Sequence, residues 1–241
     1  MAIAAWKHIE KSLGYQRMKA SLRRLIGTEL RLQIEITVKT IKLGGWWFTN
    51  QNLNQDSIVY SLGVGEDIAF DLSIIECFGA RVHAFDPTPS SIEMLSSKDL
   101  PNQFHFYPWA ITAEDGALNF YPRVRKDGSK STVMFTMIAE DYNVEDAIEV
   151  PAFCLSSVAE MLGHTQIDLL KIDIEGAEYE VLEGLLESPI KPGQLLVEFH
   201  HRFPGIGVER TAGIIRKLQK AGYKIFAISE TGREVSFLRT E

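Results

Sequence analysis

Charged side chains interrupt a stretch that otherwise reads as a buried strand. Residues 168–176, DLLKIDIEG, alternate apolar side chains with Lys171, Asp173 and Glu175, and strand side chains point alternately to opposite faces. A buried parallel strand is normally apolar on both faces, and charges buried without pairing are costly. The pattern therefore favours a functional site over its alternative, a salt-bridged strand end.

A second group of proton-handling residues, Glu198, His200 and His201, lies at the end of a later apolar run. A carboxylate or an imidazole can take the proton of a reacting hydroxyl, and histidine does so most easily near neutral pH. We expect Asp173 to face the reacting group, with Glu175 and His200 as the other catalytic candidates. Oxygen and nitrogen ligands for a metal are present, but His-x-x-x-His and Asp-x-Asp spacings are not, so the sequence predicts no metal.

Gly63 and Gly65 indicate a ligand site earlier in the chain. Gly63 directly follows the apolar run 57–62, and glycines, which lack Cβ, allow a sharp turn and close approach of a ligand. Glu66 and Asp67 then begin a predicted helix, where the dipole of the N-terminus favours acids. The order of strand, glycine turn and helix is typical of a nucleoside-binding unit.

Asp86 ends the next predicted strand, about 20 residues after the glycines, where a carboxylate can bind ribose hydroxyls. A dinucleotide fingerprint requires a third glycine where this chain has Ile68. Glu66 and Asp67 would repel a pyrophosphate, whereas they suit the ammonium and sulfonium charges of S-adenosyl-L-methionine. The sequence therefore favours that cofactor over NAD; a glycine turn that binds no ligand is the alternative.

Trp109 and Ala110 follow the predicted strand 104–107, on the rim where ligands of such sheets collect. The indole of Trp109 can stack on a flat base, and the Ala110 amide can bond an adenine edge. The alternative for Trp109 is a buried indole.

Apolar runs and helical repeats alternate from position 57 onward, which is the pattern of an α/β protein. Five strand–helix units are followed by a hairpin of residues 223–229 and 234–238. We expect a doubly wound, mostly parallel, seven-stranded Rossmann-like sheet with a C-terminal antiparallel hairpin. This domain is predicted to cover residues 45–241.

Residues 1–44 are predicted to form an arm of one helix and one strand. Positions 1–27 repeat apolar residues at helical spacing among many lysines and arginines, and positions 30–38 alternate as in a half-buried strand. The basic helix suits a packing surface, which a homodimer could use, or a surface that meets an anionic carrier or membrane.

Two other segments carry weaker expectations. The aromatic run 46–48 is expected to fill the core or to cap the cofactor cavity. Residues 112–150 look irregular, with a short strand at 118–121 and a basic loop over 123–132.

Composition limits the class of protein. The 241 residues are 45% hydrophobic and carry a net charge of −7, so a diffuse nucleic-acid or anionic-membrane surface is not expected. Two cysteines make no disulfide framework. We expect a cytoplasmic protein, since the sequence has no apolar run of the roughly 20 residues that span a bilayer and no signal-peptide core at its N-terminus.

From about Gly45 to Leu238 the sequence resembles the FkbM-type S-adenosylmethionine-dependent methyltransferases. The matching segments are SLGVGED, VHAFDPTP, WAITAEDGALNFY, LLKIDIEGAEYEVLEGL and LLVEFHHRF. The resemblance implies a Rossmann-like sheet, S-adenosylmethionine as donor, and O-methylation of a sugar or another small hydroxylated acceptor. The class often has an acid where this chain has Ser61, and a third glycine where it has Asp67.

Three other functions stay open at this point. A non-catalytic module that binds a nucleoside or a partner fits the changes at Ser61 and Asp67. An NAD-linked oxidoreductase is opposed by Ile68 and by the acids beside it. A nucleic-acid methyltransferase is opposed by the net charge, unless the basic helix guides RNA.

Overall fold

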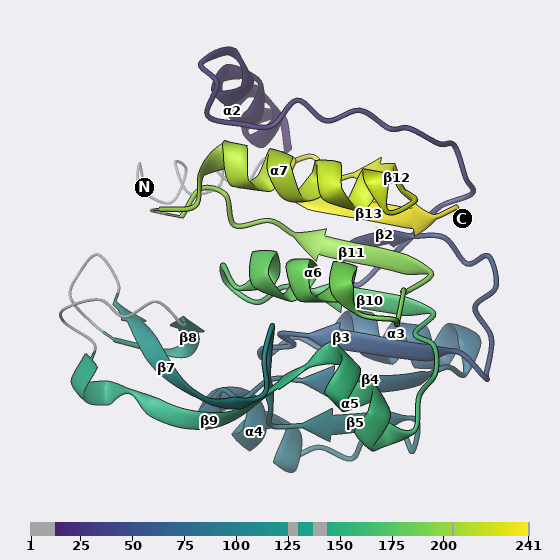
Figure 1. Ribbon diagram of the computed structural model, residues 1–241, viewed down its shortest axis with the longest axis vertical. Coiled ribbons are helices and arrows are strands. Elements are labelled where there is room, and N and C mark those ends of the chain that lie inside the picture. The colour runs from purple at the N-terminus through teal and green to yellow at the C-terminus, as the bar shows by residue number, and fades with distance from the viewer. Residues whose placement is uncertain (1–12, 125–129, 137–143, 204, 241) are drawn as a thin grey trace, which may run out of the picture.

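The chain forms a central seven-stranded sheet with helices on both faces (Figure 1). This computed structural model describes residues 13–124, 130–136, 144–203 and 205–240. The strand order is β12-β13-β11-β10-β3-β4-β5, and β13 is the one strand of this sheet that runs opposite to the others. The predicted fold class is thereby confirmed. The bounds are β3 Ile58–Leu62, β4 Arg81–Phe85, β5 Phe104–Tyr107, β10 Leu169–Ile172, β11 Gln194–Glu198, β12 Tyr223–Ile228 and β13 Glu234–Arg239.

Two apolar cores hold the layers together. On one face, α3 (Ala69–Phe78), α4 (Pro89–Ser96) and a hairpin of β1 (Ile41–Leu43) with β2 (Trp46–Phe48) pack around Ile74 and Phe48. On the other, α5 (Leu155–Leu162), α6 (Glu178–Glu187) and α7 (Gly207–Lys220) pack around Leu182 and Leu218. The parallel strands are buried on both sides because helices cover both faces.

A smaller four-stranded sheet lies beside the carboxyl ends of the parallel strands (Figure 1). Its order is β6-β9-β7-β8, with bounds β6 Ala110–Thr112, β7 Gly116–Val124, β8 Lys130–Thr136 and β9 Ile148–Cys154; a 3-10 turn, η1, covers Val144–Asp146. The irregular character predicted for 112–150 is therefore wrong for 116–124, 130–136 and 148–150; residues 125–129 of the predicted basic loop, and 137–143, lie outside the described residues. The predicted short strand is part of β7, and the end of the predicted basic loop belongs to β8.

The N-terminal arm differs from its prediction. Helix α2 covers Leu13–Leu25. The first part of the predicted helix, residues 1–12, lies outside the described residues. Residues 30–38 form no strand. They contact β12 at Ile225, whose carbonyl accepts from the amides of both Glu35 and Ile36, at 2.7 and 3.2 Å. The Ile225 amide donates to the Glu35 carboxylate at 2.8 Å. These contacts involve one residue of β12, so they do not make the repeated backbone pairing of a strand.

The aromatic run lies mainly in the core. Trp46 and Phe48 are buried against Phe70 of α3, with ring centroids 6.5 and 5.9 Å from it. They do not line the cavity described below, so the core interpretation is confirmed for these two. No helix among the described residues is long and apolar enough to span a membrane.

Candidate active site

One row of the sheet brings the predicted site residues together. Leu62 of β3 is paired with Phe85 of β4 and with Ile172 of β10, and Ile172 is paired with Val197 of β11. The next positions along these strands are Gly63, Asp86, Asp173 and Glu198. Because the strands are parallel and in register, residues from four distant segments meet at one edge.

The glycine loop is tied to both neighbouring strands. The Gly63 amide donates to the Phe85 carbonyl at 2.9 Å, and the Asp173 amide donates to the Leu62 carbonyl at 3.0 Å. Gly63 and Gly65 have φ of +73° and +55°, a region that favours glycine. A Cβ on Gly65 would meet open space, whereas one on Gly63 would meet the Asp173 carbonyl at 1.8 Å.

Asp86 fixes the same loop from β4. Its Oδ2 accepts the Gly65 amide at 2.8 Å, and its Oδ1 accepts the amide and hydroxyl of Thr88 at 2.8 and 2.6 Å. Asp67 accepts the Ala69 amide at 2.9 Å ahead of α3. These bonds set the shape of the loop before any ligand binds.

A cavity of about 270 Å³ opens over this loop. Every residue predicted to bind the cofactor lines it, as does Glu175: Gly63, Gly65, Glu66, Asp67, Asp86, Trp109, Ala110 and Asp173. The sequence-based list missed the other lining residues, among them Thr88, Phe120, Ile174 and Ala177. Phe120 comes from β7 of the small sheet, whose position no local pattern indicated. Trp109 also packs on Tyr107 at 4.8 Å between ring centroids, so it is both a core and a cavity residue.

The buried side chain of Lys171 supports the glycine loop. Lys171 is 5% exposed; its Nζ donates to the Gly63 carbonyl at 3.2 Å and lies 5.2 Å from the Trp46 ring centroid. Asp71 of α3 is fully buried in the same core, where burial raises its pKa and the charge of Lys171 opposes that rise. The class that the sequence resembles often has an acid at the position of Ser61 on the strand. In this chain Asp71 of α3 places a carboxyl group near Ser61 instead.

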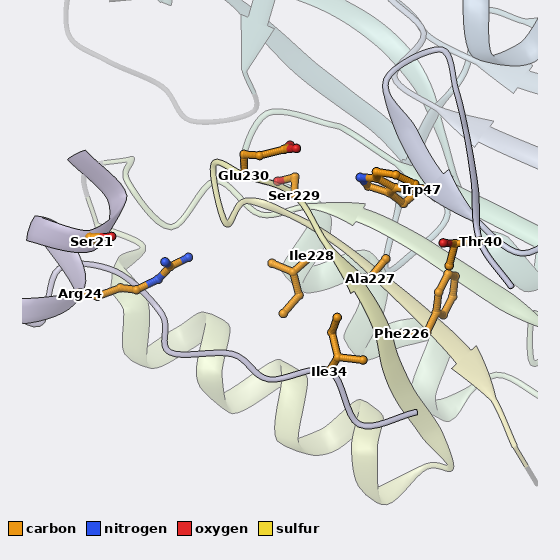
Figure 2. A pocket seen from close by; sticks show the side chains of 10 residues that line it. All are labelled: Ser21, Arg24, Ile34, Thr40, Trp47, Phe226, Ala227, Ile228, Ser229 and Glu230. Atoms are coloured by element: carbon orange, nitrogen blue, oxygen red, sulfur yellow. The ribbon is translucent and has the colours of Figure 1, made fainter. Parts of the chain in front are cut away.

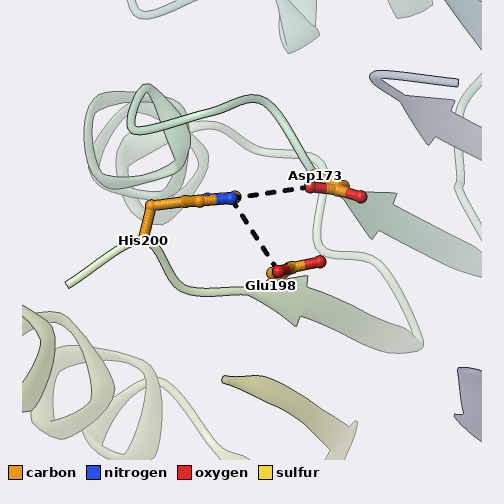
Figure 3. Close-up of side chains that lie close together, drawn as sticks. All are labelled: Asp173, Glu198 and His200. Carbon is orange, nitrogen blue, oxygen red and sulfur yellow. Dashed lines mark ion pairs between the residues drawn. The ribbon is translucent and has the colours of Figure 1, made fainter. Parts of the chain in front are cut away.

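The expectation that three charges share one face of β10 is wrong. The strand ends at Ile172, so Asp173 and Glu175 belong to the turn that follows. Lys171 points toward the Trp46 side, whereas Asp173 points toward His200 (Figure 3). Glu175 has a φ of +52°, a conformation that costs free energy in a non-glycine residue and is frequent at functional sites.

Carboxylates surround the imidazole of His200. Its Nε2 lies 3.9 Å from Asp173 Oδ1, from Glu175 Oε2 and from Glu198 Oε1. Its Nδ1 lies 3.3 Å from Oε1 of Glu178, which is fully buried. Figure 3 shows His200 reaching from the end of β11 toward Asp173 and Glu198. The predicted catalytic residues Asp173, Glu175 and His200 therefore lie together.

Electrostatic effects are strong in this cluster. Burial, helped by repulsion from Asp173, raises the pKa of Glu198 to about 7, although Arg233 opposes the shift with an Nη1 atom 2.6 Å from Glu198 Oε1. Burial alone would lower the pKa of His200, but Glu178, Glu175 and Glu198 together raise it. The site therefore has a negative potential that attracts cations and protons.

His201 does not join this cluster. It turns toward the N-terminal arm, where its Nε2 lies 2.6 Å from Oε1 of the buried Glu29, and Arg202 pairs with the same carboxylate. A separate open hollow of about 570 Å³ lies near this arm, lined by residues that include Arg24, Trp47 and Glu230 (Figure 2). Its lining includes none of the residues predicted for the site.

The strand order, the glycine loop and the acid after β4 define the Rossmann-like class of nucleoside-binding enzymes. The family described as "Methyltransferase FkbM domain" matches residues 50–225. The chain therefore belongs to the FkbM methyltransferase family, whose cofactor is S-adenosyl-L-methionine.

Similar proteins carry related names. Two are described as "Probable methyltransferase-like protein 24". The rat protein is 27% identical over 184 residues, covering 70% of this chain and 42% of its own length. The human protein is 27% identical over 188 residues, covering 73% and 44%. The chain thus spans less than half the length of these relatives. A crystal structure of methyltransferase FkbM from Methylobacillus flagellatus KT aligns with a TM-score of 0.48 at 12% identity, covering 78% of this chain and 44% of that one.

Proposed function

We propose that the chain transfers a methyl group from S-adenosylmethionine to a hydroxyl oxygen of a small acceptor such as a sugar. One observation carries the proposal: Asp173 lines the cofactor cavity and also lies 3.9 Å from the imidazole of His200. A single residue thus joins the place of the methyl donor to a group of proton acceptors. That arrangement suits an acceptor that must lose a proton as it reacts.

In this proposal, different residues of the cavity contact different parts of the cofactor. S-adenosylmethionine, when bound, supplies a methyl group on a positively charged sulfur. Gly63 and Gly65 leave room for it against the backbone, and Glu66 and Asp67 offer negative charge to its ammonium group. Asp86 holds the ribose hydroxyls while keeping its bond to the Gly65 amide. The adenine lies near Trp109 and the Ala110 amide, on the rim of the cavity.

The reaction is an in-line displacement, so the enzyme's main task is alignment. The acceptor oxygen forms a bond to the methyl carbon as the carbon–sulfur bond breaks, and the electron pair of that bond stays on sulfur. Asp173 holds the hydroxyl, and the hydroxyl proton passes to the cluster of Asp173, Glu175 and His200. The negative surroundings of the cluster favour that proton.

A small neutral or cationic acceptor fits the site better than a nucleic acid does. The chain carries a net charge of −7, and the cluster adds four carboxylates around one imidazole. A phosphate backbone would be repelled there. A non-catalytic role has less support, because Asp71 places an acid near Ser61 and the proton-accepting cluster is intact.

The test is transfer of labelled methyl groups to a panel of free sugars, carrier-linked sugars and RNA. We expect a hydroxylated sugar acceptor, with turnover reduced about 10²- to 10⁴-fold in Asp173→Asn and in His200→Ala. Glu183→Gln is the control, since Glu183 pairs with Lys217 on the surface at 2.7 Å. Near-normal turnover in both site variants would contradict the assignment.

A further inference from the structure

The gap in front of His200 has the features of an ion site. The ring is 4% exposed, and its Nε2 lies 3.9 Å from oxygens of Asp173, Glu175 and Glu198. These distances exceed the length of a hydrogen bond. Within the described part of the chain, Nε2 makes no hydrogen bond, although it points directly at the carboxylates (Figure 3). A nitrogen of a buried side chain thus faces a space bounded by negative oxygens.

We infer that this gap binds a divalent cation through Asp173, Glu198 and His200. One ligand atom from each of the three lies within 4.8 Å of the others. Mg²⁺ holds its ligands at about 2.1 Å, so two ligands on opposite sides of the ion are about 4.2 Å apart. A modest inward movement of the half-buried carboxylates therefore completes the site. Carboxylates with one imidazole suit Mg²⁺ or Mn²⁺.

Glu178 prepares His200 for this role. Its Oε1 lies 3.3 Å from Nδ1 of the ring, and the carboxylate is held in place by the amides of His200 and Gly176, at 2.7 and 2.9 Å. The Nδ1 contact does not meet hydrogen-bond geometry, so Glu178 acts on the ring through its charge; in metal sites a carboxylate at this position usually accepts the other ring N–H and fixes the tautomer. With Nδ1 beside Glu178, Nε2 is the nitrogen whose lone pair faces the gap.

The charge balance also calls for a cation. Asp173, Glu178 and Glu198 lie around the ring, and an ion pair from Arg233 brings a positive charge to Glu198. Each carboxylate is at least two-thirds buried, so solvent screens their repulsion poorly. A divalent ion offsets the excess.

What the ion does rests on the proposed function, although whether it binds does not. Asp173 lines the cofactor cavity, so an ion on its carboxylate lies beside the place of the methyl donor. There it orients the acceptor hydroxyl and lowers the pKa of that hydroxyl. With the ion bound, Asp173 and His200 serve as its ligands, so Glu175 is the member of the proposed proton-accepting cluster that takes the proton. The ligands come from the ends of two strands, which is why no short spacing in the sequence indicated them.

The test is titration of metal-free protein with Mn²⁺, with free Mn²⁺ measured by electron paramagnetic resonance. We expect one bound ion per chain, and affinity reduced at least tenfold in Asp173→Asn, Glu198→Gln and His200→Ala. Glu183→Gln removes a surface carboxylate and leaves binding unchanged. Circular dichroism checks folding; if His200→Ala does not fold, the two carboxylate variants decide.

Absence of Mn²⁺ binding, or equal binding by wild type and Asp173→Asn, would overturn the inference. The proposed function is tested separately by methyl transfer in the presence and absence of a chelator. Transfer that continues unchanged with chelator, together with no Mn²⁺ binding, removes the ion and keeps the function. Specific Mn²⁺ binding without transfer to any acceptor on the panel keeps the ion and removes the function.

Discussion

A Cβ atom on Gly63 would stand 1.8 Å from the carbonyl oxygen of Asp173. The glycine loop at Gly63 and the turn at Asp173 are therefore in direct backbone contact, with no side chain between them. The hydrogen bond from the Asp173 amide to the Leu62 carbonyl, 3.0 Å long, keeps the two segments at that distance. A shift in the backbone of one segment therefore displaces the other segment.

Substitution of the two loop glycines separates steric contact from backbone conformation. Both have positive φ, so alanine at either position costs about 1–2 kcal/mol. At Gly63 the backbone clash is added, and we expect a total loss of about 3 kcal/mol or more in the free energy of unfolding. Urea unfolding of Gly63→Ala and Gly65→Ala measures the difference. Equal losses would show that the close approach to Asp173 does not exist.

The charges of Lys171 and Asp71, buried in one core without a direct ion pair, are expected to be coupled. In Lys171→Met, the Gly63 carbonyl loses its hydrogen bond and Asp71 loses the attraction of the cation, so we expect a loss of about 1–3 kcal/mol. Replacing both, with Asp71→Leu as the second change, should recover much of that loss. The exposed Lys217 is the control, since its surface pair with Glu183 contributes about 0–1 kcal/mol. Strictly additive losses in the double variant would contradict the coupling.

The ion pairs of Glu29 predict a pH-dependent attachment of the arm. Burial alone would raise the pKa of Glu29, but the ion pair with His201 and the hydrogen bonds and charge of Arg202 outweigh it and lower the pKa to about 2 from 4.5. A depressed carboxylate pKa adds stability that is fully present above pH 4.5 and is lost as the pH falls toward 2. The contribution is on the order of 3 kcal/mol.

Urea unfolding of wild type and Glu29→Gln at several pH values measures this contribution. The advantage of wild type should be largest at neutral pH and should shrink steadily below pH 4.5. A difference that stays constant down to pH 3 would contradict the role of the carboxylate charge.

The sequence predicted those parts of the site that follow local patterns. Gly63, Asp86 and Asp173 each come directly after an apolar run, and in-register parallel strands bring such positions to one edge. The same reasoning missed Asp71 and Glu178. An acid on a predicted helix is expected to face solvent, and only the packing of the helix shows that these two are buried. It also predicted a strand at 30–38, because alternation shows which side chains could be buried but not whether a partner strand is available.

The most direct test of the central claim is calorimetric titration of the protein with S-adenosylmethionine, S-adenosylhomocysteine and NAD. Asp86 holds the loop through the Gly65 amide at 2.8 Å and lines the cavity, so Asp86→Ala should lose both the loop contact and the ribose contact. We expect micromolar binding of the two adenosyl sulfur compounds by wild type, at least tenfold weaker binding by the variant, and no binding of NAD. Binding of NAD, or equal binding of S-adenosylmethionine by wild type and Asp86→Ala, would contradict the account.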